Sequence, residues 1–288
     1  MKELEIIEAL DEIIDEFIER SKIFVQWSCY LPGLKDHLDK QESIRHVYDH
    51  EYLAFTKSTK TLISIKHLLE LEHVQDVYIL IRSMFENYLA ARYLNNEVKD
   101  DSDIKLLDDF IQNKIKVALG IYSVKYKKVV DEQGQKVADN KSIISLVMGM
   151  DKLYYAQFYG YLSRFTHLDF SILGHYIDEN NSFVLDKEVD VAISRLFVVF
   201  VYTKIFESIV TINGEDFYDG KEEEKCYEIV RKSLKLQRKI FDIYIKDLNF
   251  NHKNLVVEKQ RLNMESMLTN MNLSLEDDIG DLDKTNLF

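Results

Sequence analysis

The sequence has few residues that interrupt helices or mark tight turns. Only one proline and nine glycines occur among its 288 residues, which disfavours the frequent sharp turns and bulges of an all-β protein. Hydrophobic residues nevertheless make up 46% of the chain and charged residues 30%. This composition is sufficient for a sizeable core and excludes a chain that is disordered throughout. Long helices around a common core are therefore the first expectation.

Cysteine is also scarce, and basic residues are outnumbered by acidic ones. Cys29 and Cys226 form no C-x-x-C pair and no metal-ligand spacing, so we expect ordinary thiols of a reducing compartment, buried as small hydrophobic side chains. Lys and Arg total 37 against 50 Asp and Glu, which gives a formal net charge of −13. This charge opposes non-specific binding to nucleic acid and to anionic membranes, so a nucleic acid would need a locally basic site.

No long hydrophobic run is free of charge. The N-terminal segment is acidic and amphipathic, unlike a signal peptide. The most apolar stretch, residues 191–210, contains Arg195, Lys204 and Glu207, which leaves too short an uncharged run to span a bilayer. We therefore expect a cytoplasmic protein that has no membrane partner.

Hydrophobic residues recur at helical spacing along most of the chain. The spacing predicts helices at residues 2–30, 43–70, 74–95, 103–129, 143–150, one containing 158–170 that ends by Gly174, 187–212 and 221–248.

These helices predict an all-α protein, a multi-helix up-and-down bundle over residues 1–250. Residues 251–288 are expected to form a polar helical extension and a flexible acidic C-terminal tail. Residues 129–140 are polar around a glycine and form either a loop or a short hairpin.

Two of the predicted helices carry polar residues within apolar sequence. Residues 74–94 are hydrophobic on nearly every face, yet Arg82 and Glu86 lie four residues apart and share a helix face. Buried charges persist only when they are paired and hydrogen-bonded. This pair is thus either a structural clasp or the wall of a polar site.

The stretch FYGYLSRFTHLDF, residues 158–170, has the same character. Ser163 and His167 share a helix face, with Tyr159 one turn earlier. If the two helices face each other, a candidate catalytic site forms in which a cation binds phosphate and an imidazole transfers protons, from Arg82, Glu86, Tyr159, Ser163 and His167. The alternatives are a buried hydrogen-bonded network that fixes helix register and a pocket for a small molecule.

These two motifs also resemble a known family. The pattern R-S-x-F-E-x-x-x-x-x-x-Y-L from Arg82 to Leu94, joined to Y-x-x-L-S-x-x-x-H from Tyr159 to His167, is similar to an uncharacterised family of small bacterial α-helical proteins. Members of that family occur near defence and mobile-element genes. The resemblance covers the middle third to half of the chain and implies that the two polar helices pair, but it implies no established reaction.

A second resemblance lies in RHVYDH, residues 45–50. It is similar to the signature of HEPN domains, helical bundles that often act as metal-independent ribonucleases in toxin–antitoxin and phage-defence systems. The resemblance implies that Arg45 stabilises a phosphate and His50 handles protons, in a homodimer without a metal or other cofactor. The same spacing also suits a solvated helix face. The gap from Arg164 to His167 is too short for this signature.

Two functions of different classes follow. The first is a defence- or toxin-type effector that cuts an RNA substrate, in which Arg82 binds phosphate, Glu86 orients Arg82 and His167 transfers protons. Ser163 and Tyr159 would contact the substrate or the imidazole. The second is a non-catalytic interaction or sensor protein of such a system, whose acidic tail binds a basic protein partner. Removing residues beyond about Leu273 should abolish binding in the second case and leave catalysis intact in the first.

Overall fold

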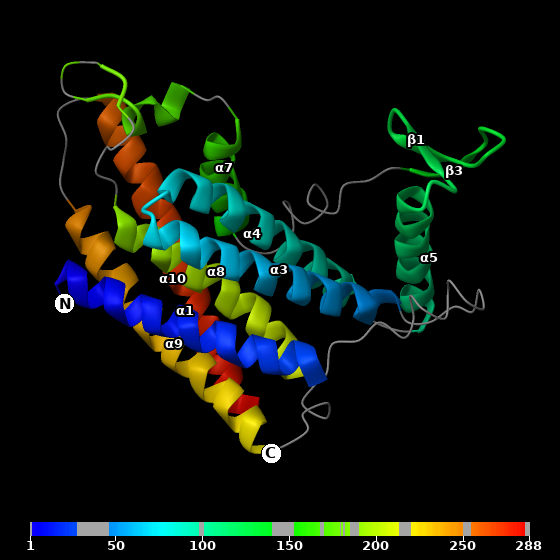
Figure 1. Ribbon diagram of the computed structural model, residues 1–288, viewed down its shortest axis with the longest axis horizontal. Coiled ribbons are helices and arrows are strands. Elements are labelled where there is room, and N and C mark those ends of the chain that lie inside the picture. The colour runs from blue at the N-terminus through cyan, green and yellow to red at the C-terminus, as the bar shows by residue number, and fades with distance from the viewer. Residues whose placement is uncertain are drawn as a thin grey trace. The chain divides into compact units, whose positions relative to one another are not determined.

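A computed structural model describes residues 2–27, 46–97, 101–139, 153–167, 170–178, 180, 182–184, 190–212, 220–249 and 255–285. These residues are mostly helical, which confirms the predicted all-α bundle (Figure 1). The chain divides into two compact units. Unit 1 comprises residues 1–23, 58–85 and 152–288, and unit 2 comprises residues 24–57 and 86–151.

Long helices build unit 1. Three of them also contribute residues to unit 2: α1 (Glu3–Trp27), α3 (His46–Glu70) and α4 (Val74–Glu97). The others are α7 (Leu153–Thr166), α8 (Val191–Ile212), α9 (Gly220–Asp247) and α10 (Leu255–Thr285), with a short 3₁₀ helix, η1, at Phe170–His175. The sequence predicted helices in these regions, and most of the predicted ends lie within a few residues of the observed ends.

Helix α8 is the buried centre of unit 1. Every residue from Ala192 to Phe206 is buried, and α8 packs directly against α9. Asp190 caps its N-terminus, because the side-chain oxygen accepts the backbone N–H groups of Ala192 and Ile193 at 3.1 and 2.9 Å. The most apolar stretch of the sequence is therefore the core helix of a bundle.

The two basic residues of α8 are paired with acidic residues of other helices. Arg195 Nε donates to Asp11 Oδ1 at 2.8 Å, and the Lys204 ammonium pairs with Asp278 of α10. Lys204 Nζ also lies 4.9 Å from the centre of the Phe200 ring, within the range of a cation–π interaction. Across the described residues, no helix has the length and apolar character needed to cross a membrane.

Two hydroxyl networks connect the helices of unit 1 in its interior. The Tyr202 hydroxyl lies 2.6 Å from Ser21 Oγ and 2.7 Å from Thr59 Oγ1. One residue further along α8, Thr203 is bonded to Ser233 and Gln237 of α9 at 2.8 and 2.9 Å. Because these groups are buried, a shift of one helix past another would leave polar atoms without partners. The networks therefore stabilise one helix register.

The C-terminal segment differs from the expected flexible tail. Residues after 250 do contain the polar helix expected there, but α10 continues to Thr285 and includes most of the acidic sequence. Its apolar side packs against other helices of unit 1, chiefly α9 and α7, and buries Met267, Leu268, Met271 and Leu275. The acidic composition concealed this stripe, which has the spacing of one helix face. Residues 286–288 lie outside the described residues.

Unit 2 contains α5 (Asp101–Ala118) and a three-stranded antiparallel sheet of β1 (Ser123–Lys125), β2 (Lys128–Val130) and β3 (Lys136–Asp139), in the order β1-β2-β3. The predicted helix over 103–129 was wrong beyond Ala118. Gly120 has a φ of +75° and ends α5 with the hydrogen bonds of a Schellman motif: Ile121 N–H to Lys116 C=O at 2.9 Å and Gly120 N–H to Val117 C=O at 3.1 Å. The hairpin alternative for residues 129–140 is correct for β2 and β3.

Cys226 is buried in α9, as expected for a small hydrophobic side chain. Burial raises the pKa of its thiol to about 12, so the thiolate is scarce at neutral pH. Two other features predicted from the sequence fall outside the described residues, Cys29 and the helix over 143–150.

Candidate functional site

Helices α4 and α7 meet through aromatic side chains in unit 1. The Tyr78 and Phe165 ring centres lie 4.4 Å apart, and those of Phe85 and Phe158 lie 5.1 Å apart. Tyr154, Phe158, Leu162 and Phe165 are buried on α7, at the three- and four-residue steps of one helix face. This contact brings the polar residues of the two helices close to each other.

Arg82 of α4 is held by two hydroxyl groups of α7. Its Nη2 donates to the Tyr159 hydroxyl at 2.7 Å, and its Nη1 donates to Thr166 Oγ1 at 2.6 Å. The guanidinium carbon also lies 4.8 Å from the centre of the Tyr159 ring. Two bonds from one planar group determine its orientation as well as its position. We call Arg82, Tyr159 and Thr166 the Arg82 cluster.

Thr166 was not among the residues predicted for this site. It follows Tyr159 by seven residues, two helical turns, and so lies on the same stripe of α7. The spacing that selected Ser163 would have selected Thr166 as well. Arg82 and Tyr159, in contrast, were placed together by the sequence and are bonded in the structure.

Ser163 is directed toward its own helix. Its hydroxyl donates to the Tyr159 carbonyl one turn earlier at 2.7 Å, a common local bond for serine within a helix. The side chain is half-buried beside the Arg82 cluster. Its predicted contact with a substrate or with an imidazole stays a prediction.

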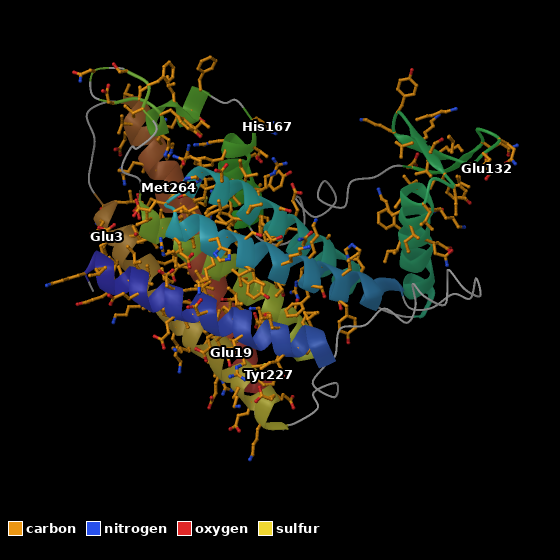
Figure 2. All side chains as sticks on the ribbon, viewed as in Figure 1. Glu3, Glu19, Glu132, His167, Tyr227 and Met264 are labelled. Atoms are coloured by element: carbon orange, nitrogen blue, oxygen red, sulfur yellow. The ribbon has the colours of Figure 1, made fainter. Side chains whose placement is uncertain are left out.

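His167 is exposed, whereas the sequence suggested a buried imidazole. Helix α7 ends at Thr166, earlier than the predicted end by Gly174. His167 follows directly, and Figure 2 shows it at the C-terminal end of α7. Arg82 is bonded to the residue immediately before it. The candidate site is therefore a partly exposed surface at the end of a helix.

The remaining α4 candidate is Glu86, which is half-buried one turn beyond Arg82. It lies in the part of α4 assigned to unit 2, while Arg82 belongs to unit 1. The predicted role of Glu86 in orienting Arg82 stays a prediction.

The HEPN-like motif is only partly described. Arg45 lies outside the described residues. His50 is half-buried on α3, and its Nδ1 atom is buried with no hydrogen-bond partner in the described part of the chain. Burial, together with the positive charge of Lys57, lowers the pKa of His50. Its environment thus favours the neutral imidazole.

This environment predicts a pH dependence of stability. His50 has a lowered pKa in the folded chain, so the unfolded chain takes up its proton first as the pH falls through about 6.5, the ordinary value for histidine. The stability contributed by neutral His50 is present above that pH and is lost below it. His50→Gln should therefore weaken the loss of stability between neutral and mildly acidic pH, as measured by urea unfolding.

Exposed His67→Gln is the matched control and should retain the wild-type pH dependence. Equal pH dependence in wild type and His50→Gln would contradict the assignment.

Within the described part of the chain, no group of three or more His, Cys, Asp or Glu side chains is placed to hold a metal ion.

Comparison with known families supports the first of the two resemblances. Residues 50–184 match the profile of a family of unknown function, DUF5677. The match contains both polar helices, α4 and α7, and leaves α9 and α10 outside. The resemblance to an uncharacterised family is confirmed for these residues.

The DUF5677 match includes His50 and the Arg82 cluster, while Arg45 precedes it. No curated protein and no solved structure matches the chain. The HEPN resemblance therefore stays a prediction.

Proposed function

We propose that the protein is an RNA-cutting effector of a bacterial defence or toxin–antitoxin system, with its reactive site at the Arg82 cluster and His167. One observation carries this proposal: the Tyr159 and Thr166 hydroxyls orient Arg82, and the exposed His167 directly follows Thr166 in the chain. Two hydroxyl acceptors fix the orientation of the guanidinium. Such a group is suited to phosphate, which binds the planar fork of arginine well.

The reaction would use the RNA's own 2′-hydroxyl. Its oxygen attacks the adjacent phosphorus and forms a 2′,3′-cyclic phosphate while the bond from phosphorus to the 5′-oxygen breaks. The 2′-hydroxyl proton passes to water, and His167 in its protonated form donates a proton to the leaving 5′-oxygen. Arg82 stabilises the negative charge that develops on the phosphate oxygens. The site in this proposal needs neither a metal nor another cofactor.

The other residues of the site have supporting roles. Tyr159 and Thr166 are positioning residues for the Arg82 guanidinium, and Glu86 is proposed to orient it from one turn away on α4. In the same proposal the protein acts in the cytoplasm as a homodimer, as the HEPN resemblance implies. Arg45 and His50 form the competing candidate site.

The test is induced expression in a bacterial host, with growth and total RNA followed for wild type, His167→Ala, Arg82→Ala and the paired Arg45→Ala/His50→Ala variant. Growth arrest with fragmented RNA is expected for wild type, and both effects should be lost in His167→Ala and Arg82→Ala. The RNA fragments should end in 2′,3′-cyclic phosphates.

Two matched controls are available. Arg164→Ala removes a guanidinium of the same helix that lies 5.9 Å from the Tyr161 ring, outside the Arg82 cluster, and His67→Ala removes another exposed imidazole. Both should still cause arrest. Loss of arrest only in the paired Arg45/His50 variant would move the site to the HEPN-like motif. Each variant is first checked for folding by circular dichroism.

A non-catalytic interaction or sensor protein is the second candidate, favoured by the net charge of −13. Intact RNA and normal growth with the wild-type chain would favour it. Truncation after Leu273 is no longer a clean test of the two functions, because it removes buried Leu275 and the Asp278 partner of Lys204. The variants above leave α10 whole and avoid this problem.

A further inference from the structure

One segment of unit 2 has the opposite charge to the whole chain. Residues 114–130 contain five lysines and no acidic residue, in a protein with a formal net charge of −13. The lysines are Lys114, Lys116, Lys125, Lys127 and Lys128. They lie near the end of α5, in the first two strands of the sheet and in the turn between these strands, which follow one another in the same unit (Figure 1). A local basic site of this kind is what an acidic protein needs to bind a polyanion.

Three of the lysines surround one exposed tyrosine at the turn between β1 and β2. Lys125 and Lys128 are paired across the two strands, so Tyr126 and Lys127 form a two-residue turn. Tyr126 is 99% exposed, and the three lysine side chains are exposed as well. We call Lys125, Tyr126, Lys127 and Lys128 the lysine turn.

The lysine turn is built from residues that disfavour its own conformation. Tyr126 has a φ of +58°, a region that glycine or asparagine adopts at much lower cost. Lys125 and Lys128 face each other in the ladder, where like charges are destabilising. Neither feature contributes to folding, and a bound anion would relieve the second. Local strain with this exposure is typical of a functional site.

Of the three acidic residues between 123 and 139, two lie away from this turn and one lies beside it. Asp131 and Glu132 belong to the connection at the opposite end of β2 (Figure 2), where Asp131 accepts the Gln135 N–H at 2.8 Å. Asp139 lies beside Lys128 in the ladder and pairs with Lys136 at 2.8 Å. One carboxylate, that of Asp139, is therefore close to the lysine turn, and it is paired with Lys136 of β3.

We infer that the lysine turn binds single-stranded RNA, with Tyr126 stacking on a base and Lys125, Lys127 and Lys128 contacting the flanking phosphates. A fully exposed aromatic ring between cations is the arrangement that recognises unpaired bases and backbone together. The assignment of RNA rests on the proposed function.

The test measures binding of the full-length chain to a fluorescein-labelled oligouridine by fluorescence anisotropy at several salt concentrations. Replacing all three turn lysines with glutamine should reduce the slope of log affinity against log salt by about 2, since each phosphate contact on a single strand contributes about 0.7. Tyr126→Gly should weaken binding about tenfold through the loss of base stacking. Tyr126→Phe keeps the ring and should bind as wild type does.

Tyr126→Gly separates binding from folding. Glycine adopts the positive φ of this position without strain, so the variant should be at least as stable as wild type while it binds RNA more weakly. The matched charge control is Lys235→Gln/Lys239→Gln/Lys246→Gln, three exposed lysines of α9. This control should retain the wild-type salt slope.

Four results would overturn the inference: no binding of wild type at low salt, binding by the triple lysine variant and Tyr126→Gly that equals wild type, an equal loss in the α9 control, or tighter binding to oligodeoxythymidine or to phosphatidylserine vesicles than to RNA. Arg82→Ala and His167→Ala are measured in the same assay. If RNA is never cut but the turn variants still bind more weakly, the proposed function fails and the lysine turn stands. If RNA is cut and the triple lysine variant and Tyr126→Gly bind it normally, the proposed function stands and the inference about the lysine turn fails.

Discussion

Asp278→Ala is expected to lower the free energy of unfolding by about 3–5 kcal/mol, the usual cost of leaving a buried charge without its partner. The Lys204 side chain is only 3% exposed, and its ammonium is paired with Asp278 from α10. Removing the carboxylate leaves that cation desolvated on the central helix of unit 1. Urea unfolding followed by circular dichroism measures the change.

A surface pair on the same helices is the matched control. Glu276 of α10 pairs with Arg238 of α9, and the two side chains are 51% and 37% exposed. Glu276→Ala should cost less than about 1 kcal/mol, as exposed ion pairs do. The double variant Lys204→Met/Asp278→Ala should recover much of the lost stability, because it removes the buried charge itself. An Asp278→Ala cost no greater than that of Glu276→Ala would contradict the buried pairing.

Phe158→Ala is expected to lower the free energy of unfolding by about 3–5 kcal/mol, the range for removing a phenyl ring from a packed core. The Phe158 side chain is fully buried. Its ring centre lies 5.1 Å from that of Phe85 and 5.1 Å from that of Phe197, so it joins α4, α7 and α8. Removal of the ring leaves a cavity between the three helices, and all three would have to shift to fill it.

Two variants calibrate this result. Phe158→Leu keeps most of the volume and should cost clearly less than alanine. Phe170→Ala removes a ring that is 86% exposed and should change stability by no more than about 0.5 kcal/mol. If Phe158→Ala matched Phe170→Ala, the packing of α7 between α4 and α8 would be wrong. The same variant bears on function, since Tyr159 of the Arg82 cluster follows Phe158 directly.

The helices were predictable because their hydrophobic residues repeat with the period of a helix. Helix α4 was predicted at 74–95 and is found at Val74–Glu97. The continuation of the fourth helix to Val129 was wrong, since Gly120 ends it and SVKYKKVV forms strands instead. A glycine after a helical run is itself a stop signal. The signal that ends this helix was therefore present in the local sequence.

The acidic C-terminal segment illustrates a different limit. Its composition predicted flexibility, yet Leu275 is buried and Asp278 is paired with Lys204. Nothing near Asp278 in the sequence indicates its partner, 74 residues earlier. The partner of a charged residue depends on which helices are neighbours, and that is a tertiary property.

The candidate site was likewise predictable from the sequence only in part. Helical spacing placed Arg82 and Glu86 on one face and Tyr159, Ser163 and His167 on another, because side chains four residues apart share a face. Only the packing of α4 on α7 decided that Arg82 binds Tyr159 and Thr166, and that Ser163 bonds to its own backbone. Only the end of α7 at Thr166 decided that His167 is exposed.

The sequence by itself determined the helical class, the central apolar helix and the faces on which polar residues lie, because periodicity and composition are local properties of the chain. The tertiary structure alone decided which faces meet, which charges are buried with partners and that Tyr126 is exposed at a turn with a positive φ. These depend on contacts between residues that are distant in sequence, or on a turn conformation that its residues disfavour. Local propensities do not encode either.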